Sequence, residues 1–140
     1  MSMSSYRLLE HTADMGIEAT AATLEDLYAQ AAKGLIAIIF GDTSGPALRD
    51  RVIELDGSDL ADLLVRWLNE ILYLVEMEHF LPCQFTLDPI QNHHLRGKVR
   101  GFHFDEERVQ AEREVKAVTY HQLEVRRQAA GWLARVYVDL

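Results

Sequence analysis

The stretch from Asp59 to Met77 constrains the fold more than any other, because its apolar residues recur at helical spacing. Asp62, Arg66 and Glu70 lie on the opposite arc as i,i+4 partners of opposite charge. The pattern predicts an amphipathic helix of roughly 28 Å that is capped by Ser58 and buries its apolar arc against another layer. That arc consists of Leu60, Leu63, Leu64, Trp67, Leu68, Ile71, Leu72 and Val75.

A second amphipathic helix is predicted from Leu24 to Ile39. Thr23 precedes it as a candidate N-cap, and Gly41 follows as a stop signal. Its apolar residues fall on one face at a spacing of 3.6 residues: Leu24, Leu27, Tyr28, Ala31, Leu35, Ile38 and Ile39.

The remaining patterned segments predict β-strands, and the last two are joined by Gln128 to Gly131, a short connection typical of a hairpin. Two helices with these strands indicate the α+β class. We expect one domain over residues 1–140, with both helices packed on one face of a mixed, mostly antiparallel sheet. The expected strands are Tyr6–Leu9, Gly16–Ala21, Arg51–Leu55, Cys83–Leu87, His94–Phe104, Val118–Arg127 and Trp132–Asp139.

Charge and cysteine content narrow the possible functions. Fourteen basic and 22 acidic residues give a net charge of −8, which argues against a bare nucleic-acid binder. The acidic balance fits a cation-binding protein or one that docks on a basic partner. Cys83 is the one cysteine, so an internal disulfide and a multi-cysteine zinc site are excluded. With no apolar run near 18 residues, we expect no membrane association and a cytoplasmic location.

The segment from His11 to Gly16 lies between two predicted strands and is expected to form a tight loop. In one interpretation Asp14 or His11 points into a functional site. In the other, Asp14 forms an Asx-type turn, and Gly16 adopts a positive φ angle.

The end of the chain places Asp139 next to the terminal carboxylate of Leu140. Hard cations such as Ca²⁺ prefer oxygen ligands of this kind. The alternative is a frayed, solvated terminus. The predicted last strand keeps its alternation as far as Asp139, which favours an end that is tied into the sheet.

Hairpin geometry relates Lys116 to this end of the chain. If Arg127 pairs with Trp132, Asp139 lies opposite Tyr120 within a residue or two, and Lys116 falls just beyond Asp139. The sequence therefore predicts that Lys116 and Asp139 meet at one edge of the sheet. The alternative for Lys116 is a solvated cation that balances neighbouring glutamates.

The candidate site residues Asp14, Lys116 and Asp139 belong to segments of the chain that resemble the archease family. The segments follow the family's order and extend over almost the whole chain: His11–Ala19, Leu63–Tyr73, Lys116–His121 and Val138–Leu140. Met15 and the final Leu140 stand where the family commonly has isoleucine. Both differences are conservative and leave the oxygen donors unchanged.

The resemblance implies a non-catalytic protein that activates an RtcB-type RNA ligase in tRNA splicing and RNA repair, by promoting guanylylation of the ligase and its multiple turnover. The family's divalent-metal site, usually Ca²⁺, corresponds to Asp14, Asp139 and the carboxylate of Leu140. Lys116 is expected to reach the ligase, and His11 and Thr119 are expected to contact it. The resemblance also implies that this protein contacts RNA only indirectly, through the ligase.

Two alternatives come from other functional classes. A general chaperone or protein-interaction module would shield clients with its broad apolar helices, without dependence on metal. A small metal-dependent hydrolase would use Asp14, Asp139 and His11, but the sequence arranges no further general base or nucleophile.

Overall fold

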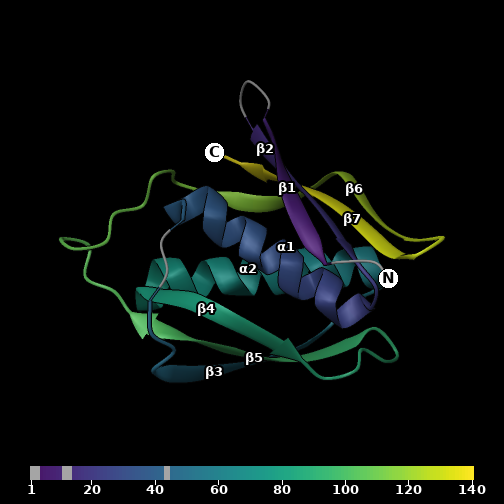
Figure 1. Ribbon diagram of the computed structural model, residues 1–140, viewed down its shortest axis with the longest axis horizontal. Helices are drawn as coiled ribbons and strands as arrows, with labels where there is room; N and C mark the ends of the chain where they lie inside the picture. The colour runs from purple at the N-terminus through teal and green to yellow at the C-terminus, as the bar shows by residue number, and fades with distance from the viewer. Residues whose placement is uncertain (1–3, 11–13, 43–44) are drawn as a thin grey trace.

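Two helices lie side by side as a layer between two antiparallel sheets in the computed structural model, which describes residues 4–10, 14–42 and 45–140 (Figure 1). The helices are α1 (Leu24–Phe40) and α2 (Leu60–Glu78). The strands are β1 (Ser5–Glu10), β2 (Asp14–Ala21), β3 (Arg49–Asp56), β4 (Phe80–Leu87), β5 (His94–His103), β6 (Ala117–Gln128) and β7 (Gly131–Asp139).

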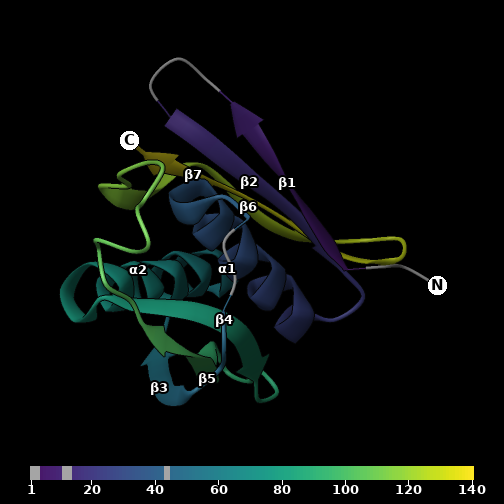
Figure 2. The same ribbon diagram turned by 60° about the vertical axis from the view of Figure 1, so that its left-hand side comes forward.

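The strands form a four-stranded sheet of order β1-β2-β7-β6 and a three-stranded sheet of order β3-β5-β4. The α+β class and the two amphipathic helices are confirmed, and every strand pair is antiparallel. The expectation of one sheet is corrected, because the helices cover one face of each of two sheets (Figure 2).

The second sheet is required because α1 is apolar on nearly all sides. Beyond its predicted face, Ala32, Ile36 and Phe40 are also buried. A helix that is apolar all round must be covered on more than one side. Accordingly, α1 packs on β1, β2 and β7 of one sheet and on β4 of the other.

The predicted helix ends agree with the structure at α1 and differ at α2. Thr23 accepts a hydrogen bond from the backbone N–H of Asp26 at 3.2 Å, and Gly41 ends the helix with a φ angle of 68°. In α2 the N-cap is Asp59, not Ser58, and it accepts from the N–H of Asp62 at 2.7 Å. Ser58 lies one residue earlier, where its N–H and hydroxyl both donate to the carboxylate of Asp62.

The predicted hairpin register is confirmed next to the turn, where Arg127 pairs with Trp132. An irregularity between Thr119 and Glu124 then shifts the register of β6. As a result, Asp139 lies opposite Ala117, not near Tyr120 as expected. The prediction counted residues along a regular hairpin, so it did not include the extra residues of the irregularity.

Among the described residues, neither helix is long and apolar enough to cross a bilayer.

Candidate functional site

Asp14 and Asp139 are direct partners in the ladder between β2 and β7, although they lie near opposite ends of the chain. Side chains of directly opposed residues share one face of a sheet, with Cβ atoms about 4.5–5.5 Å apart. Met15 and Ile17 alternate with Asp14 and are buried toward the helices. Both aspartates therefore lie on the outer face of the four-stranded sheet, away from the core.

The end of the chain is held between two strands. Asp139 pairs with Asp14 on one side and with Ala117 on the other. Its carbonyl also accepts a hydrogen bond from the N–H of Lys116 at 2.9 Å. Thus the frayed-terminus alternative is wrong, and the predicted meeting of Lys116 with Asp139 is confirmed. The carboxyl end of Leu140 lies beside the start of β2 (Figures 1 and 2).

The expected loop from His11 to Gly16 is shorter than predicted. Asp14 to Gly16 already belong to β2, and Gly16 does not adopt a positive φ angle, so the Asx-turn interpretation is wrong. Gly16 instead makes room for a ring, because a Cβ atom there would lie 2.7 Å from Cε1 of Tyr137. His11 lies outside the described residues.

The hydroxyl of Thr119 is engaged within the protein. It donates to the carbonyl of Tyr137 at 3.1 Å and accepts from the N–H of His121 at 3.3 Å. Thr119 is half-buried on the same face as Asp139, where the irregularity of β6 begins. Its contact with a partner stays a prediction.

The free edge of β6 is closed by Asn69 of α2. The Asn69 amide donates to the carbonyl of Val118 at 3.3 Å and accepts from its N–H at 3.1 Å. One side chain thus satisfies both main-chain groups that a neighbouring strand would otherwise pair. Since Val118 lies two residues after Lys116, α2 fixes this part of β6 beside Asp139.

A second contact between α2 and β6 centres on the buried carboxylate of Asp62. The hydroxyl of Tyr120 donates to it at 2.6 Å, and Arg66 binds it at 2.9 Å. The hydrogen bond from Tyr120, with those from Ser58 and Arg66, holds the pKa of Asp62 well below its usual range. The same hydrogen bond raises the pKa of Tyr120.

Asp62, Asn69 and Tyr120 were not predicted as site residues. The sequence assigned the polar arc of α2 to solvent and to i,i+4 pairs. The sequence did contain one indication of these contacts. The polar arc of this otherwise apolar helix carries two short polar side chains, Asp62 and Asn69, which are suited to hydrogen bonds with backbone groups.

Farther along the outer face, Glu18 binds two arginines. It lies at 2.7 Å from Arg7 and 2.6 Å from Arg135. These two hydrogen-bonded guanidinium groups lower the pKa of Glu18. Glu18 is four residues from Asp14, so this ion triad lies roughly 13 Å along β2 from the aspartate pair.

The sequence was compared with those of known protein families. The sequence description of the Archease protein family (MTH1598/TM1083) matches residues 6–140. This chain belongs to the archease family.

Similar proteins span the archease chain almost completely. Curated "Protein archease" sequences include those of Methanopyrus kandleri (37% identical, covering 94% of this chain and 96% of the relative), Methanosarcina barkeri (35%; 96% and 95%) and Pyrococcus furiosus (34%; 99% and 100%). The solution structure of Methanobacterium thermoautotrophicum protein 1598 superimposes with a TM-score of 0.85 at 29% identity, covering 97% of this chain and 99% of that one.

The oxygen donors at the candidate site of this archease suit a hard cation, but they are few. Asp14, Asp139 and the terminal carboxylate of Leu140 supply oxygen atoms, which Ca²⁺ and Mg²⁺ prefer. Within residues 4–10, 14–42 and 45–140, no three His, Cys, Asp or Glu side chains come together as a metal-binding group. Among the described residues, the side chains of Asp14 and Asp139 and the terminal carboxylate of Leu140 are therefore the oxygen donors that this position offers.

Proposed function

We propose that this archease is a non-catalytic activator of an RtcB-type RNA ligase, which it assists in guanylylation and multiple turnover. In this proposal it presents a divalent cation, with Ca²⁺ the expected ion, to the ligase. The ligase acts in tRNA splicing and RNA repair, and RNA is contacted through the ligase alone.

The observation that carries the proposal is the direct pairing of Asp14 with Asp139 across β2 and β7. Folding alone does not require two aspartates opposed on one sheet face, because like charges in that arrangement destabilise the pair. A cation between them removes the repulsion. The opposed pair thus supports a role in cation binding.

The small donor set supports a role at an interface. Ca²⁺ takes about six to eight oxygen ligands, whereas the three carboxylates of Asp14, Asp139 and Leu140 supply three when each binds through one oxygen atom. In the proposed complex the remaining positions are filled by water and by oxygens of the ligase or its bound nucleotide. The ion thereby links the two proteins and neutralises phosphate charge where the nucleotide is transferred.

Lys116 supplies a second positive charge at the same edge. It is exposed, and its backbone is tied to Asp139, so its position follows that of the carboxylate pair. The proposed role of its ammonium group is to bind a nucleotide phosphate in the ligase. The net charge of −8 favours encounter with a basic, RNA-binding partner.

The chaperone alternative loses its main support in the structure. It rests on the apolar arcs of the two helices, yet Leu63, Trp67 and Leu68 of α2 are fully buried, as are Leu27 and Leu35 of α1. These surfaces hold the two sheets together and are not available to a client.

The test is a single-turnover guanylylation assay of the ligase from the same organism, with and without this protein. We expect faster formation of the ligase–guanylate adduct, and loss of that effect after chelation of divalent ions from the activator. To keep the ligase's own metal constant, the activator is chelated and desalted before mixing, and the loaded activator is treated in parallel. An equal adduct rate with and without the protein would refute the proposal.

A further inference from the structure

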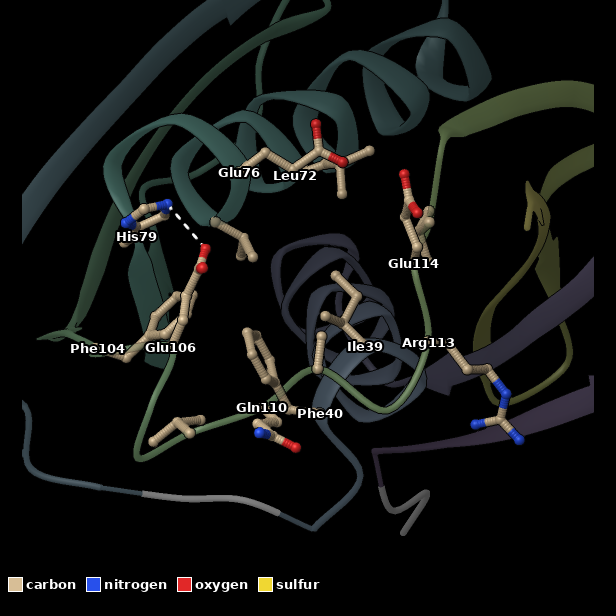
Figure 3. A pocket seen from close by; sticks show the side chains of 14 residues that line it. Ile39, Phe40, Leu72, Glu76, His79, Phe104, Glu106, Gln110, Arg113 and Glu114 are labelled. Atoms are coloured by element: carbon tan, nitrogen blue, oxygen red, sulfur yellow. Dashed lines mark ion pairs between the residues drawn. The ribbon is translucent and has the colours of Figure 1, made fainter.

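A hollow of about 510 Å³ opens where α1 and α2 both end (Figure 3). Its volume is within the range of ligand-binding clefts. The segment between β5 and β6 forms one wall. Apolar residues form its floor: Ile39, Phe40, Leu72, Val75 and Val115.

The rim of this hollow is acidic. Glu76 of α2, together with Glu106 and Glu114 of the segment before β6, lines the opening. Glu106 lies 3.2 Å from His79, whereas no hydrogen bond or ion pair joins the side-chain carboxylate of Glu76 or Glu114 to another described residue. Arg113 is the one arginine of the rim, and its guanidinium group points away from the hollow (Figure 3).

The helix ends add to the negative potential. The carboxyl end of a helix carries a partial negative charge that basic residues normally offset. Neither α1 nor α2 has a basic residue in its last turn. Glu76 lies near the end of α2, where a carboxylate opposes the helix dipole. Such a local electrostatic conflict is expected where function outweighs stability.

The hollow lies next to the candidate site along the chain. Glu114 and Val115 directly precede Lys116, whose N–H binds Asp139. The wall is held in place by α1, since the carbonyl of Ile39 accepts the N–H of Glu112 at 2.7 Å and of Arg113 at 3.3 Å. A protein that contacts Lys116 is thus within a few residues' length of the hollow.

We infer that this hollow binds an arginine or lysine side chain, with an adjoining apolar residue, from the surface of the partner ligase. The aliphatic stem lies on the apolar floor, and the cationic head meets Glu76 and Glu114. The inference rests on the proposed function and adds an anchor that is separate from the aspartate pair. A bare metal ion is not the occupant, since the rim's described residues form no metal-binding group of three.

The test compares the double variant Glu76→Gln, Glu114→Gln with the control Glu107→Gln. Glu107 is exposed on the same segment but does not line the hollow. Affinity for the ligase is measured by calorimetry, and guanylylation is measured as a function of activator concentration. We expect the double variant to bind about three- to tenfold more weakly and to need a correspondingly higher concentration for half-maximal stimulation. Maximal stimulation should be retained.

Thermal unfolding of the free protein separates this role from a structural one. Removing two carboxylates that oppose the helix ends should leave the Tm unchanged or raise it by about one to three degrees. Weaker binding together with a markedly lower Tm, or equal binding by all three proteins, overturns the inference. Equal binding with metal-dependent stimulation intact leaves the proposed function standing, whereas a wild-type protein that neither binds nor stimulates the ligase contradicts both.

Discussion

Asn69 and Val118 are joined by two hydrogen bonds, through which one amide side chain replaces a missing strand at the edge of β6. The contact lies between Lys116 and the irregularity that begins at Thr119. Helix α2 therefore determines where the start of β6 lies relative to Asp139. The sheet alone would hold this segment on one side only.

Replacing Asn69 by alanine removes both hydrogen bonds. We expect the free energy of unfolding to fall by about 1–3 kcal/mol, because two main-chain groups lose their partner. Stimulation of the ligase should fall as well, since Lys116 is no longer fixed. Chemical denaturation and guanylylation measure the two effects, with Gln84→Ala at an exposed position of β4 as the control.

A double-mutant cycle shows whether Asn69 acts through Lys116. In a Lys116→Ala background, Asn69→Ala should cause no further loss of stimulation at a temperature where both proteins are folded. Independent, multiplicative losses would mean that Asn69 affects stimulation by a route other than Lys116.

Tyr120→Phe tests the contact at Asp62. It removes a hydrogen bond to a charged group, so the free energy of unfolding at neutral pH should fall by about 1.5–3 kcal/mol. The pKa of Asp62 should rise, because the hydrogen bond from Tyr120 is the leading cause of its depression. Carbon-detected NMR titration follows that pKa. Tyr73→Phe is the control, since Tyr73 lies on α2, as Asp62 does, and is 54% exposed. An equal loss of stability in both variants would contradict a specific role for the hydrogen bond of Tyr120 to Asp62.

His94 gives the protein a pH dependence of known sign. Its ring nitrogens lie 2.6 Å from Asp56 and 2.8 Å from Glu54, and these hydrogen bonds raise its pKa above 6.5. The folded state thus binds the proton more tightly than the unfolded state. The stabilisation is complete below pH 6.5 and is lost as the pH rises through the raised pKa.

The variant His94→Gln should accordingly lower the Tm at about pH 5.5 and change it little at about pH 9. Thermal unfolding at the two pH values measures the difference. His93→Gln, at the neighbouring exposed position, is the control for the loss of an imidazole ring. A Tm loss for His94→Gln that is the same at both pH values would show that the ring acts by packing.

Extending the chain by two glycines tests the terminal carboxylate. The extension keeps the side chains of Asp14 and Asp139 but moves the carboxylate away from Leu140. We expect Ca²⁺ affinity in the ligase complex to fall about tenfold or more, as is typical when one charged ligand is lost. Calorimetry measures it, and an N-terminal extension of the same length is the control. Unchanged affinity would remove Leu140 from the site.

The sequence predicted the elements well because their periodicity is strong, as in α2 and β7. The hairpin count also placed Lys116 near Asp139, although the hydrogen bond between them depends on the register shift in β6 that the count did not include. Pairing of Asp14 with Asp139 is non-local, and only the family resemblance placed both in one site. The two-sheet arrangement could have been inferred from Ala32, Ile36 and Phe40, which make α1 apolar beyond one face.

Other features were beyond pattern analysis. The irregularity in β6 includes Tyr120, whose hydroxyl binds Asp62 of α2, and no hydrophobic period records either feature. The need for glycine at position 16 comes from the Tyr137 ring across the sheet, which a Cβ atom would contact too closely. Both are tertiary contacts that override local preference.

The central claim is that Asp14 and Asp139 together hold the cation that activates the ligase. The most direct measurement is the single-turnover guanylylation rate of the ligase with Asp14→Asn or Asp139→Asn, beside Asp50→Asn as a surface control on β3. We predict that either site variant remains folded, by circular dichroism, yet loses nearly all stimulation, while the control stimulates as the wild type does. Full stimulation by folded Asp14→Asn and Asp139→Asn proteins would contradict the claim.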